Sequence, residues 1–473
     1  MKNKKRMIGL VAIAAVAGYC INGQAQSVDS LLDKLVDKGV LSVKEANELR
    51  EESDKDFSKA YSAKSGMPEW VSALKFNGDM RVRSERFHFS NPAGTDRNRF
   101  RYRLRFGAVA NMTDAFEAGV RLTSSEAASG GGTGGDPISG NTTFQDNGSK
   151  KFIYLDLAYA RWTPVRSPEW LLSVTAGKME NPFVFSDLVF DSDYTPEGGA
   201  VNLTYTLGEN HAIKAASGYF LLDEISGSSH DPYLYGAQVR LESVWNKHFS
   251  TSAGVGTVGI VNEDRLNASQ GATLGGAGGT NFVGSSTWTV PNQNGGNLRS
   301  VAGSGAGLTG ASGNLVNNYT PIIADASATF TLEEFWNYKA PFPIKLSADY
   351  MHNPAAADEN NAFSVGLTLG KAGKRGLWEV GYRYKHIEGD SWYEELVDSD
   401  FGAFYQTGST RSGNSSGYIA GTNVKGHVLK AAYSPYNALT LGLTATCAEL
   451  IQENPAGSDS KTWRIQADAV LKF

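Results

Sequence analysis

The amino-acid sequence predicts an all-β fold, a transmembrane barrel of sixteen antiparallel strands that follows a short N-terminal helical segment in the periplasm. Apolar and polar residues alternate in most segments after residue 74, as in strands with one apolar face. The number of these segments is even, and their connections alternate between long and short. A barrel in a bacterial outer membrane requires both features, whereas a soluble β-sandwich accounts only for the alternation.

Residues 1–25 are typical of a secretory signal peptide. Four basic residues come first, namely Lys2, Lys4, Lys5 and Arg6. The apolar run from Ile8 to Gly18 is too short to span a bilayer as a helix, and Gly23-Gln24-Ala25 provides the small residues of a cleavage site. Lipidation of Cys20 is disfavoured because the bulky Tyr19 precedes it. We expect the mature chain to begin near residue 26.

The composition argues against several classes of function. The chain has 473 residues, with 44 Lys and Arg against 49 Asp and Glu. Without the four basic residues of the leader, 40 basic residues face 49 acidic ones, a formal charge of −9, and such an exported chain is poorly suited to nucleic acid. Cys447 is the one cysteine after the leader, so we expect no internal disulfide.

Residues 26–66 predict a short helical segment outside the barrel. Apolar residues from Val28 to Val36 fall at helical spacing, Gly39 ends this run, and Ser42 to Glu45 form a capping box that opens a second helix. A solvated spacer in the periplasm is the favoured interpretation. An oligomerising coil is the alternative, although the segment has few heptads.

Residues 67–473 predict the barrel. In the first strand Leu74, Phe76 and Val82 alternate with polar residues, and the later strands show the same period of two. The sixteen predicted strands are 74–84, 97–112, 115–124, 151–162, 170–179, 199–206, 211–221, 233–243, 247–259, 319–332, 343–352, 361–370, 376–386, 424–433, 439–448 and 461–473.

The second of these strands shows the two faces most clearly. Its sequence RNRFRYRLRF, from Arg97 to Phe106, places an arginine at every second position and an apolar or aromatic residue between. In a membrane barrel the apolar face contacts lipid and the arginines face a water-filled lumen. A soluble sandwich would have to cover sixteen apolar faces with protein.

The connections support the same topology. Odd-numbered connections such as 125–150, 260–318 and 387–423 are long, and many are rich in Gly, Ser and Asn. Most even-numbered connections are short, as at Thr113-Asp114 and 244–246. Long outer loops and tight periplasmic turns produce this asymmetry.

The last strand closes the barrel and ends on an aromatic residue. Trp463 and Phe473 lie ten residues apart in an alternating segment, so a tilted strand separates the two rings by roughly 25 Å, the spacing of the two aromatic girdles. A terminal aromatic residue resembles the signal that the barrel-assembly machinery reads in outer-membrane proteins. We therefore predict that Phe473 is an assembly signal.

The third long connection, about 180–198, differs from the others. It carries Phe183, Phe185 and Phe190 where other loops carry Gly and Ser, so we expect it to fold inward and pack on the barrel wall. Four acidic residues accompany these rings: Asp187, Asp191, Asp193 and Glu197.

We expect these carboxylates to face a ladder of arginines that lines the lumen at a constriction. The predicted pore-lining arginines are Arg81, Arg83, Arg99, Arg101, Arg103 and Arg105. Opposed charges across a narrow aqueous gap produce a transverse field that orders polar solutes and shapes ion selectivity. The alternative is that these groups pair with one another and fill space.

The sequence favours neither a metal site nor an enzyme. Asp191-Ser192-Asp193 with Glu197, or Asp398-Ser399-Asp400, could supply oxygen ligands for calcium, but solvated or arginine-paired carboxylates are the favoured interpretation. No nucleophile elbow, HExxH motif or phosphate-binding loop occurs. We predict no catalytic residues, no metal and no cofactor.

Several segments resemble one family, the "putative porin" family of Gram-negative outer membranes. They are WVSALKFNGDMRVRSE from Trp70, GKMENPFVFSDLVFDSDYTPEGGAV from Gly177, LVDSDFG from Leu396 and the terminal Phe473. The resemblance implies a sixteen-stranded barrel, similar to general porins whose third loop folds into the lumen, and passive transport. By analogy to phosphate-selective porins, the arginines suggest anions.

The sequence thus predicts an outer-membrane porin that passes small hydrophilic solutes and ions. Two alternatives remain: an anion- or phosphate-selective channel, and a surface adhesin or antigen displayed on a barrel. Expected partners are outer-membrane lipids, the barrel-assembly machinery and the solutes themselves. A homotrimer is left open, because Ala324, Ala326 and Ala328 form a small-residue face that could pack between subunits.

Overall fold

A computed structural model describes residues 68, 70–127, 134–224, 229–266, 295–299, 315–406, 417–454 and 457–473. The expected leader and helical segment, as well as most of the 260–318 loop, lie outside these residues. The chain divides into two units, Met1–Ala73 and Leu74–Phe473, and the second contains the barrel. No helix among the described residues is long and apolar enough to cross a membrane.

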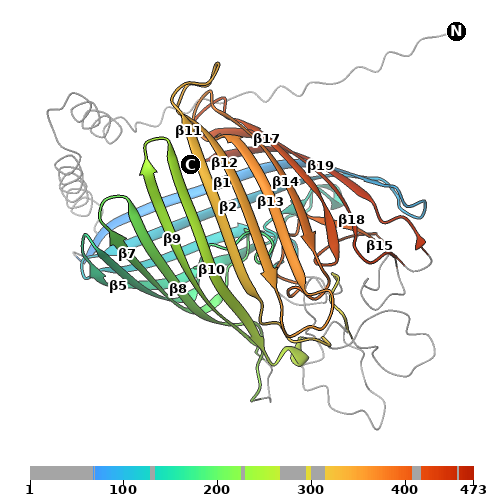
Figure 1. The fold of residues 1–473 in the computed structure, drawn as a ribbon, viewed down its shortest axis with the longest axis horizontal. Helices are drawn as coiled ribbons and strands as arrows, with labels where there is room; N and C mark the ends of the chain where they lie inside the picture. The colour runs from blue at the N-terminus through green and yellow to red at the C-terminus, as the bar shows by residue number, and fades with distance from the viewer. Residues whose placement is uncertain are drawn as a thin grey trace. The chain divides into compact units, whose positions relative to one another are not determined.

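Sixteen long strands build the barrel (Figure 1). They are β1 (Val71–Phe89), β2 (Arg97–Met112), β3 (Phe116–Ser124), β5 (Ile153–Arg166), β6 (Trp170–Lys178), β7 (Glu197–Leu207), β8 (His211–Leu221), β9 (Tyr233–Asn246), β10 (Phe249–Val261), β11 (Ile322–Leu332), β12 (Phe342–His352), β13 (Asn361–Gly370), β14 (Trp378–Ile387), β17 (Val424–Tyr433), β18 (Leu439–Leu450) and β19 (Thr462–Lys472).

Short elements lie in the connections. They are β4 (Thr142–Thr143), η1 (Asp146–Gly148), η2 (Glu263–Arg265), β15 (Gly402–Tyr405) and β16 (Gly417–Ala420). Strand β4 pairs with β2 beyond the point where β3 ends, and β15 pairs with β16 as a separate hairpin.

The sheet closes on itself. Each long strand pairs antiparallel with its neighbour in the chain, and β19 pairs with β1 from Asp79↔Lys472 to Phe89↔Thr462. This closure removes the unpaired edges that a bilayer does not tolerate. The predicted sixteen-stranded antiparallel barrel is therefore confirmed. Strand β1 runs five residues past its predicted end at 84 because it stays paired with β19.

The two faces of the sheet are inverted relative to a soluble protein. On β2, Phe100 is 56% and Phe106 is 44% exposed, whereas Arg101 and Arg103 retain only 7% and 8% exposure. The same pattern recurs around the sheet, where exposed apolar side chains alternate with covered polar ones. The apolar face suits lipid, and the polar face lines the interior.

Candidate functional site in the barrel lumen

The third loop (179–196) crosses the interior from one wall to the opposite one. It leaves β6 and returns to β7, yet Asp187 forms ion pairs with Arg383 and Lys385 of β14 at 2.5 and 2.7 Å. Seven long strands separate β6 from β14 in either direction around the sheet. On its way the loop accepts a 2.8 Å hydrogen bond at the Val184 carbonyl from Arg240 of β9.

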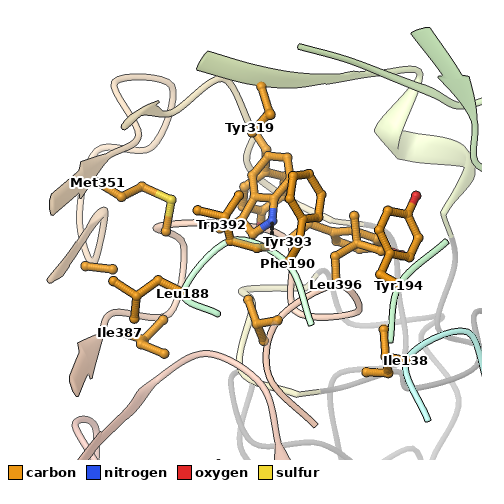
Figure 2. Close-up of a cluster of buried hydrophobic side chains, with 14 of the residues drawn as sticks. Ile138, Leu188, Phe190, Tyr194, Tyr319, Met351, Ile387, Trp392, Tyr393 and Leu396 are labelled. Atoms are coloured by element: carbon orange, nitrogen blue, oxygen red, sulfur yellow. Dashed lines mark hydrogen bonds between the residues drawn. The ribbon is translucent and has the colours of Figure 1, made fainter. Parts of the chain in front are cut away.

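Apolar side chains hold this loop in place. Phe183, Leu188 and Phe190 are buried, and they belong to a cluster that also contains apolar residues of several strands (Figure 2). Gly236 of β9 permits the approach of Phe183, because a Cβ there would lie 2.6 Å from the ring. The burial of these rings gives the loop a fixed position against the wall.

The described parts of the seventh loop, 388–406 and 417–423, also fold inward, and the loop packs on the third. Figure 2 shows Trp392 of the seventh loop beside Phe190 of the third, and their ring centroids lie 6.2 Å apart. The indole N–H of Trp392 donates a 2.8 Å hydrogen bond to the Val189 carbonyl, and the ring is fully buried. The interior therefore contains a junction of two loops.

Sequence reasoning missed the seventh loop, although it carries a signal of the same kind as the third. The apolar residues that its described part buries are Trp392, Tyr393, Leu396, Val397, Phe401, Ala403, Phe404 and Tyr405. Its carboxylates also form ion pairs with the barrel wall. Asp398 lies 2.6 Å from Lys385, and Asp400 lies 2.8 to 2.9 Å from Arg464 and Arg83. A comparison of apolar content among the long loops would have identified it.

The predicted ladder arginines line one wall, on the neighbouring strands β1 and β2. Arg103 bridges Asp193 of the third loop at 2.7 Å and Asp79 of β1 at 2.9 Å. Arg105 contacts the same two carboxylates, at 2.7 Å from Asp79 and 3.5 Å from Asp193. The structure thus brings one acidic residue of the third loop against the ladder.

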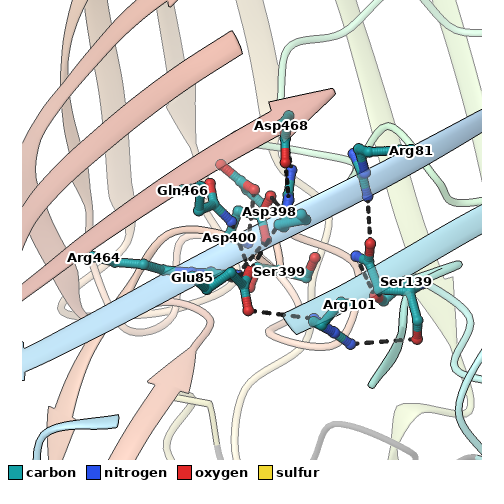
Figure 3. A network of polar contacts seen from close by, with 12 residues as sticks. Arg81, Glu85, Arg101, Ser139, Asp398, Ser399, Asp400, Arg464, Gln466 and Asp468 are labelled. Atoms are coloured by element: carbon teal, nitrogen blue, oxygen red, sulfur yellow. Dashed lines mark hydrogen bonds and ion pairs between the residues drawn. The ribbon is translucent and has the colours of Figure 1, made fainter. Parts of the chain in front are cut away.

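The other ladder arginines contact residues outside the third loop, and Figure 3 shows part of this network. Arg83 pairs with Asp468 of β19 at 2.7 Å and with Asp400 at 2.9 Å, and Arg99 pairs with Glu85. Arg81 and Arg101 are the remaining two arginines of the ladder. Neither has a carboxylate within 3.5 Å among the described residues.

Three predicted acidic residues lie away from the ladder. Asp187 reaches β14 on the opposite wall, as described above. Asp191 accepts 2.8 Å hydrogen bonds from the backbone N–H groups of Asp193 and Ser399. Glu197 begins β7 and pairs with Lys178 of β6 at 3.0 Å. The described residues contain no group of three His, Cys, Asp or Glu arranged to hold a metal ion.

The loop carboxylates have opposite electrostatic environments. Burial alone would raise the pKa of Asp187, but Lys385 and Arg383 outweigh it and hold the pKa well below its usual value. Burial opposed by Arg464 and Arg83 likewise leaves the pKa of Asp400 well below normal. Burial, reinforced by the charges of Asp398 and Asp193, raises the pKa of Asp191 well above normal. Of these three carboxylates, Asp191 is the one whose surroundings favour the neutral form.

Terminal Phe473 lies at the closure of the barrel. Its backbone N–H donates to the Gly78 carbonyl at 3.0 Å, and the Gly78 N–H donates to the Phe473 carbonyl at 2.8 Å. A Cβ on Gly78 would lie 2.6 Å from the aromatic ring, so glycine is required for this contact. The ring itself is 59% exposed on the lipid side.

The chain is similar to known proteins in its sequence and in its fold. A protein-family model described as "Putative porin" matches residues 91–468. No curated protein sequence matches the chain.

Among solved structures, OprB of Pseudomonas putida is 10% identical with a TM-score of 0.48, over 85% of this chain and 94% of that one. OmpF of Salmonella typhi, solved in complex with daunomycin, is 10% identical with a TM-score of 0.44, over 85% and 97%. OmpT of Vibrio cholerae in its trimer form is 10% identical with a TM-score of 0.42, over 85% and 99%.

Proposed function

The chain belongs to the family described as "Putative porin", and on this basis we propose that it lets small hydrophilic solutes and ions diffuse through a restricted lumen. It is a β-barrel of the bacterial outer membrane, and its family and fold are typical of channels without enzymatic activity. The third loop forms the restriction in this proposal. The six predicted arginines and the loop carboxylates set the field that a solute crosses.

One observation carries the proposal: the third loop extends from the β2 wall to the β14 wall. The 2.7 Å contact of Asp193 with Arg103 and the 2.7 Å contact of Asp187 with Lys385 support it. A solute that passes the loop moves beside fixed charges of both signs. Such an arrangement orients polar solutes and disfavours apolar ones, because an apolar solute gains nothing in return for displaced water.

An anion-selective channel is the second candidate, favoured by one asymmetry. The wall of β1, β2 and β19 has seven buried or half-buried arginines, and five carboxylates form ion pairs with them at 3.5 Å or less. The arginines are Arg81, Arg83, Arg99, Arg101, Arg103, Arg105 and Arg464. The carboxylates are Asp79, Glu85, Asp193, Asp400 and Asp468.

Planar-bilayer recording tests the proposal. We expect the refolded mature chain to give discrete conductance steps and a reversal potential on the anion side under a salt gradient. A variant with Arg101, Arg103 and Arg105 changed to Ser loses three positive charges and should shift the reversal potential toward cation preference. Silence of the folded native barrel would refute the porin function and favour a barrel that displays its loops.

The remaining parts of the proposal concern assembly. We expect the barrel-assembly machinery to read Phe473, so a chain without this residue should accumulate less in the outer membrane. A homotrimer fits the alanine patch on β11, where Ala326 lies opposite Ala253 of β10 and Ala348 of β12. Crosslinking in membranes tests the trimer, and recovery of monomer alone would exclude it.

A further inference from the structure

We infer that Arg81 and Arg101, together with Asn141, form a binding site for a small oxyanion on the lumen wall. Such an ion carries at least two acceptor oxygens, as a phosphate or a carboxylate does. The inference deepens the proposed function, on which it rests, by naming the residues that would hold an anion and its chemical class. It starts from the distribution of charge along the arginine wall.

Five of the seven arginines on this wall have a carboxylate within hydrogen-bonding distance. For example, Arg464 lies 2.6 Å from Glu85 and 2.8 Å from Asp400. Arg101 has only Glu85, at 4.0 Å, and that carboxylate already pairs with Arg99 and Arg464. Arg81 has no carboxylate within 4.0 Å in the described part of the chain. Two guanidinium charges are therefore in surplus.

The two surplus arginines converge on one short segment of the second loop, the connection between β3 and β5. The Arg81 Nη2 donates to the Asn141 side-chain oxygen at 2.7 Å, and the Arg101 Nη2 lies 3.4 Å from the Asn141 carbonyl. Figure 3 shows both arginines extending toward the segment that contains Ser139. Both charged donors thus face neutral oxygens of Asn141. An anion would accept hydrogen bonds from these guanidinium groups more strongly than a neutral oxygen does.

Donor groups remain available at this place. The Nε atoms of Arg81, Arg101 and Arg103 are buried and have no hydrogen-bond partner among the described residues. Arg101 retains only 7% exposure, and Arg81 is half-buried. A buried guanidinium with unused N–H groups is costly, and a bound oxyanion would satisfy it.

The surrounding carboxylates do not fill the site. Glu126 acts electrostatically on Arg101, but its carboxylate accepts hydrogen bonds from the backbone and hydroxyl of Thr143. Asp193 and Asp468 act on Arg81 from a distance, and both are already paired with other arginines. Guanidinium forks match the paired oxygens of phosphate and carboxylate, which defines the ligand class.

Equilibrium dialysis with radiolabelled inorganic phosphate tests the site on the folded full-length mature chain. We expect saturable binding of one phosphate per chain, with competition by acetate showing that carboxylates share the site. Arg101→Gln should weaken phosphate binding by about 10-fold or more, because a charge-assisted hydrogen-bonding partner is lost.

Two further variants make the result specific. Asn141→Asp keeps the size of the side chain and places a carboxylate where Arg81 already donates at 2.7 Å. This internal anion neutralises one of the two surplus charges, so phosphate binding should fall by at least as much as in Arg101→Gln, and the variant tests the site even if Arg101→Gln fails to fold. Arg161→Gln removes one charge from a lumen arginine that already pairs with Glu117 at 3.1 Å, so binding should change less than twofold.

The outcomes separate this inference from the proposed function. Absence of saturable phosphate binding to a barrel that conducts would overturn the inference alone. Equal loss of binding in Arg161→Gln and Arg101→Gln would also overturn it, because the effect would then be one of net charge. Binding by a barrel that does not conduct would refute the porin function and leave the site standing.

Discussion

At the scale of single residues, Asp191 stands out among the loop carboxylates. Its two oxygens accept backbone N–H groups from the third and seventh loops, and Asp398 and Asp193 lie near it. Burial and these like charges favour the protonated form. Asp187 and Asp400, which face cationic partners, favour the ionised form. One junction therefore combines carboxylates with opposite preferences.

This contrast predicts a pH dependence of the loop junction. The folded state binds the Asp191 proton more tightly than the unfolded chain does, so this residue stabilises the junction below its ordinary pKa of 3.8 and progressively less as the pH rises toward the raised pKa. The low pKa values of Asp187 and Asp400 act in the other direction. Their contribution is present above 3.8 and is lost as the pH falls below it.

Hydrogen exchange of the Asp191 and Ser399 amides measures this effect, after correction for intrinsic exchange rates. We expect protection to fall as the pH rises above about 4, and Asp191→Asn, which cannot ionise, to flatten that decline. Identical pH profiles of the native chain and the variant would contradict the assignment. Asp223→Asn, in the connection between β8 and β9 and outside the junction, is the control and should leave the profile unchanged.

At the scale of elements, the two inward loops act as one structural unit. The third loop contributes Leu188, Val189 and Phe190, and the seventh contributes Trp392, whose ring is fully buried between them. The Asp191 N–H also donates to the Leu396 carbonyl at 2.7 Å. Apolar packing and backbone hydrogen bonds thus hold each loop against the other, while ion pairs tie both to the wall.

Truncation of the Trp392 side chain should release the two loops from each other without unfolding the barrel. Trp392→Ala removes a buried ring and should destabilise the junction by about 3–5 kcal/mol, because the neighbours cannot fill the cavity. Limited proteolysis should then cleave the loops faster, while the strands keep the heat-modifiable gel mobility of a folded barrel. Unchanged cleavage would show that the ring does not hold the junction. Trp392→Phe retains most of the packing, loses the hydrogen bond to Val189 and should have a smaller effect.

At the scale of the whole molecule, local pattern accounts for the strands and tertiary packing accounts for the lumen. The period of two locates all sixteen strands, because each strand must present one face to lipid and one to water. The apolar residues of the third loop, Phe183 among them, indicated an inward position. The partner of Asp187 could not be predicted, because an eighteen-residue loop can reach several walls and the sequence does not say which one.

The arginine wall shows the same limit of sequence reasoning. Alternation places Arg99 to Arg105 on the lumen face of β2, yet which of them lacks a carboxylate depends on the registers of β1, β2 and β19 and on the seventh loop. Asp400 is an example, since it comes from a loop about 300 residues away from Arg83 in the chain and still neutralises it. Pair formation across a barrel is a property of its closure.

If the barrel conducts solutes past the third loop, this loop sets the size of the largest solute that passes. Liposome swelling with a series of neutral sugars of increasing size tests it most directly, using the native chain and a variant whose residues 183–190 are replaced by Gly and Ser. The native chain should admit small sugars and exclude larger ones, whereas the variant should admit larger sugars as well. Equal size limits for the two folded chains, or no swelling with either, would contradict it.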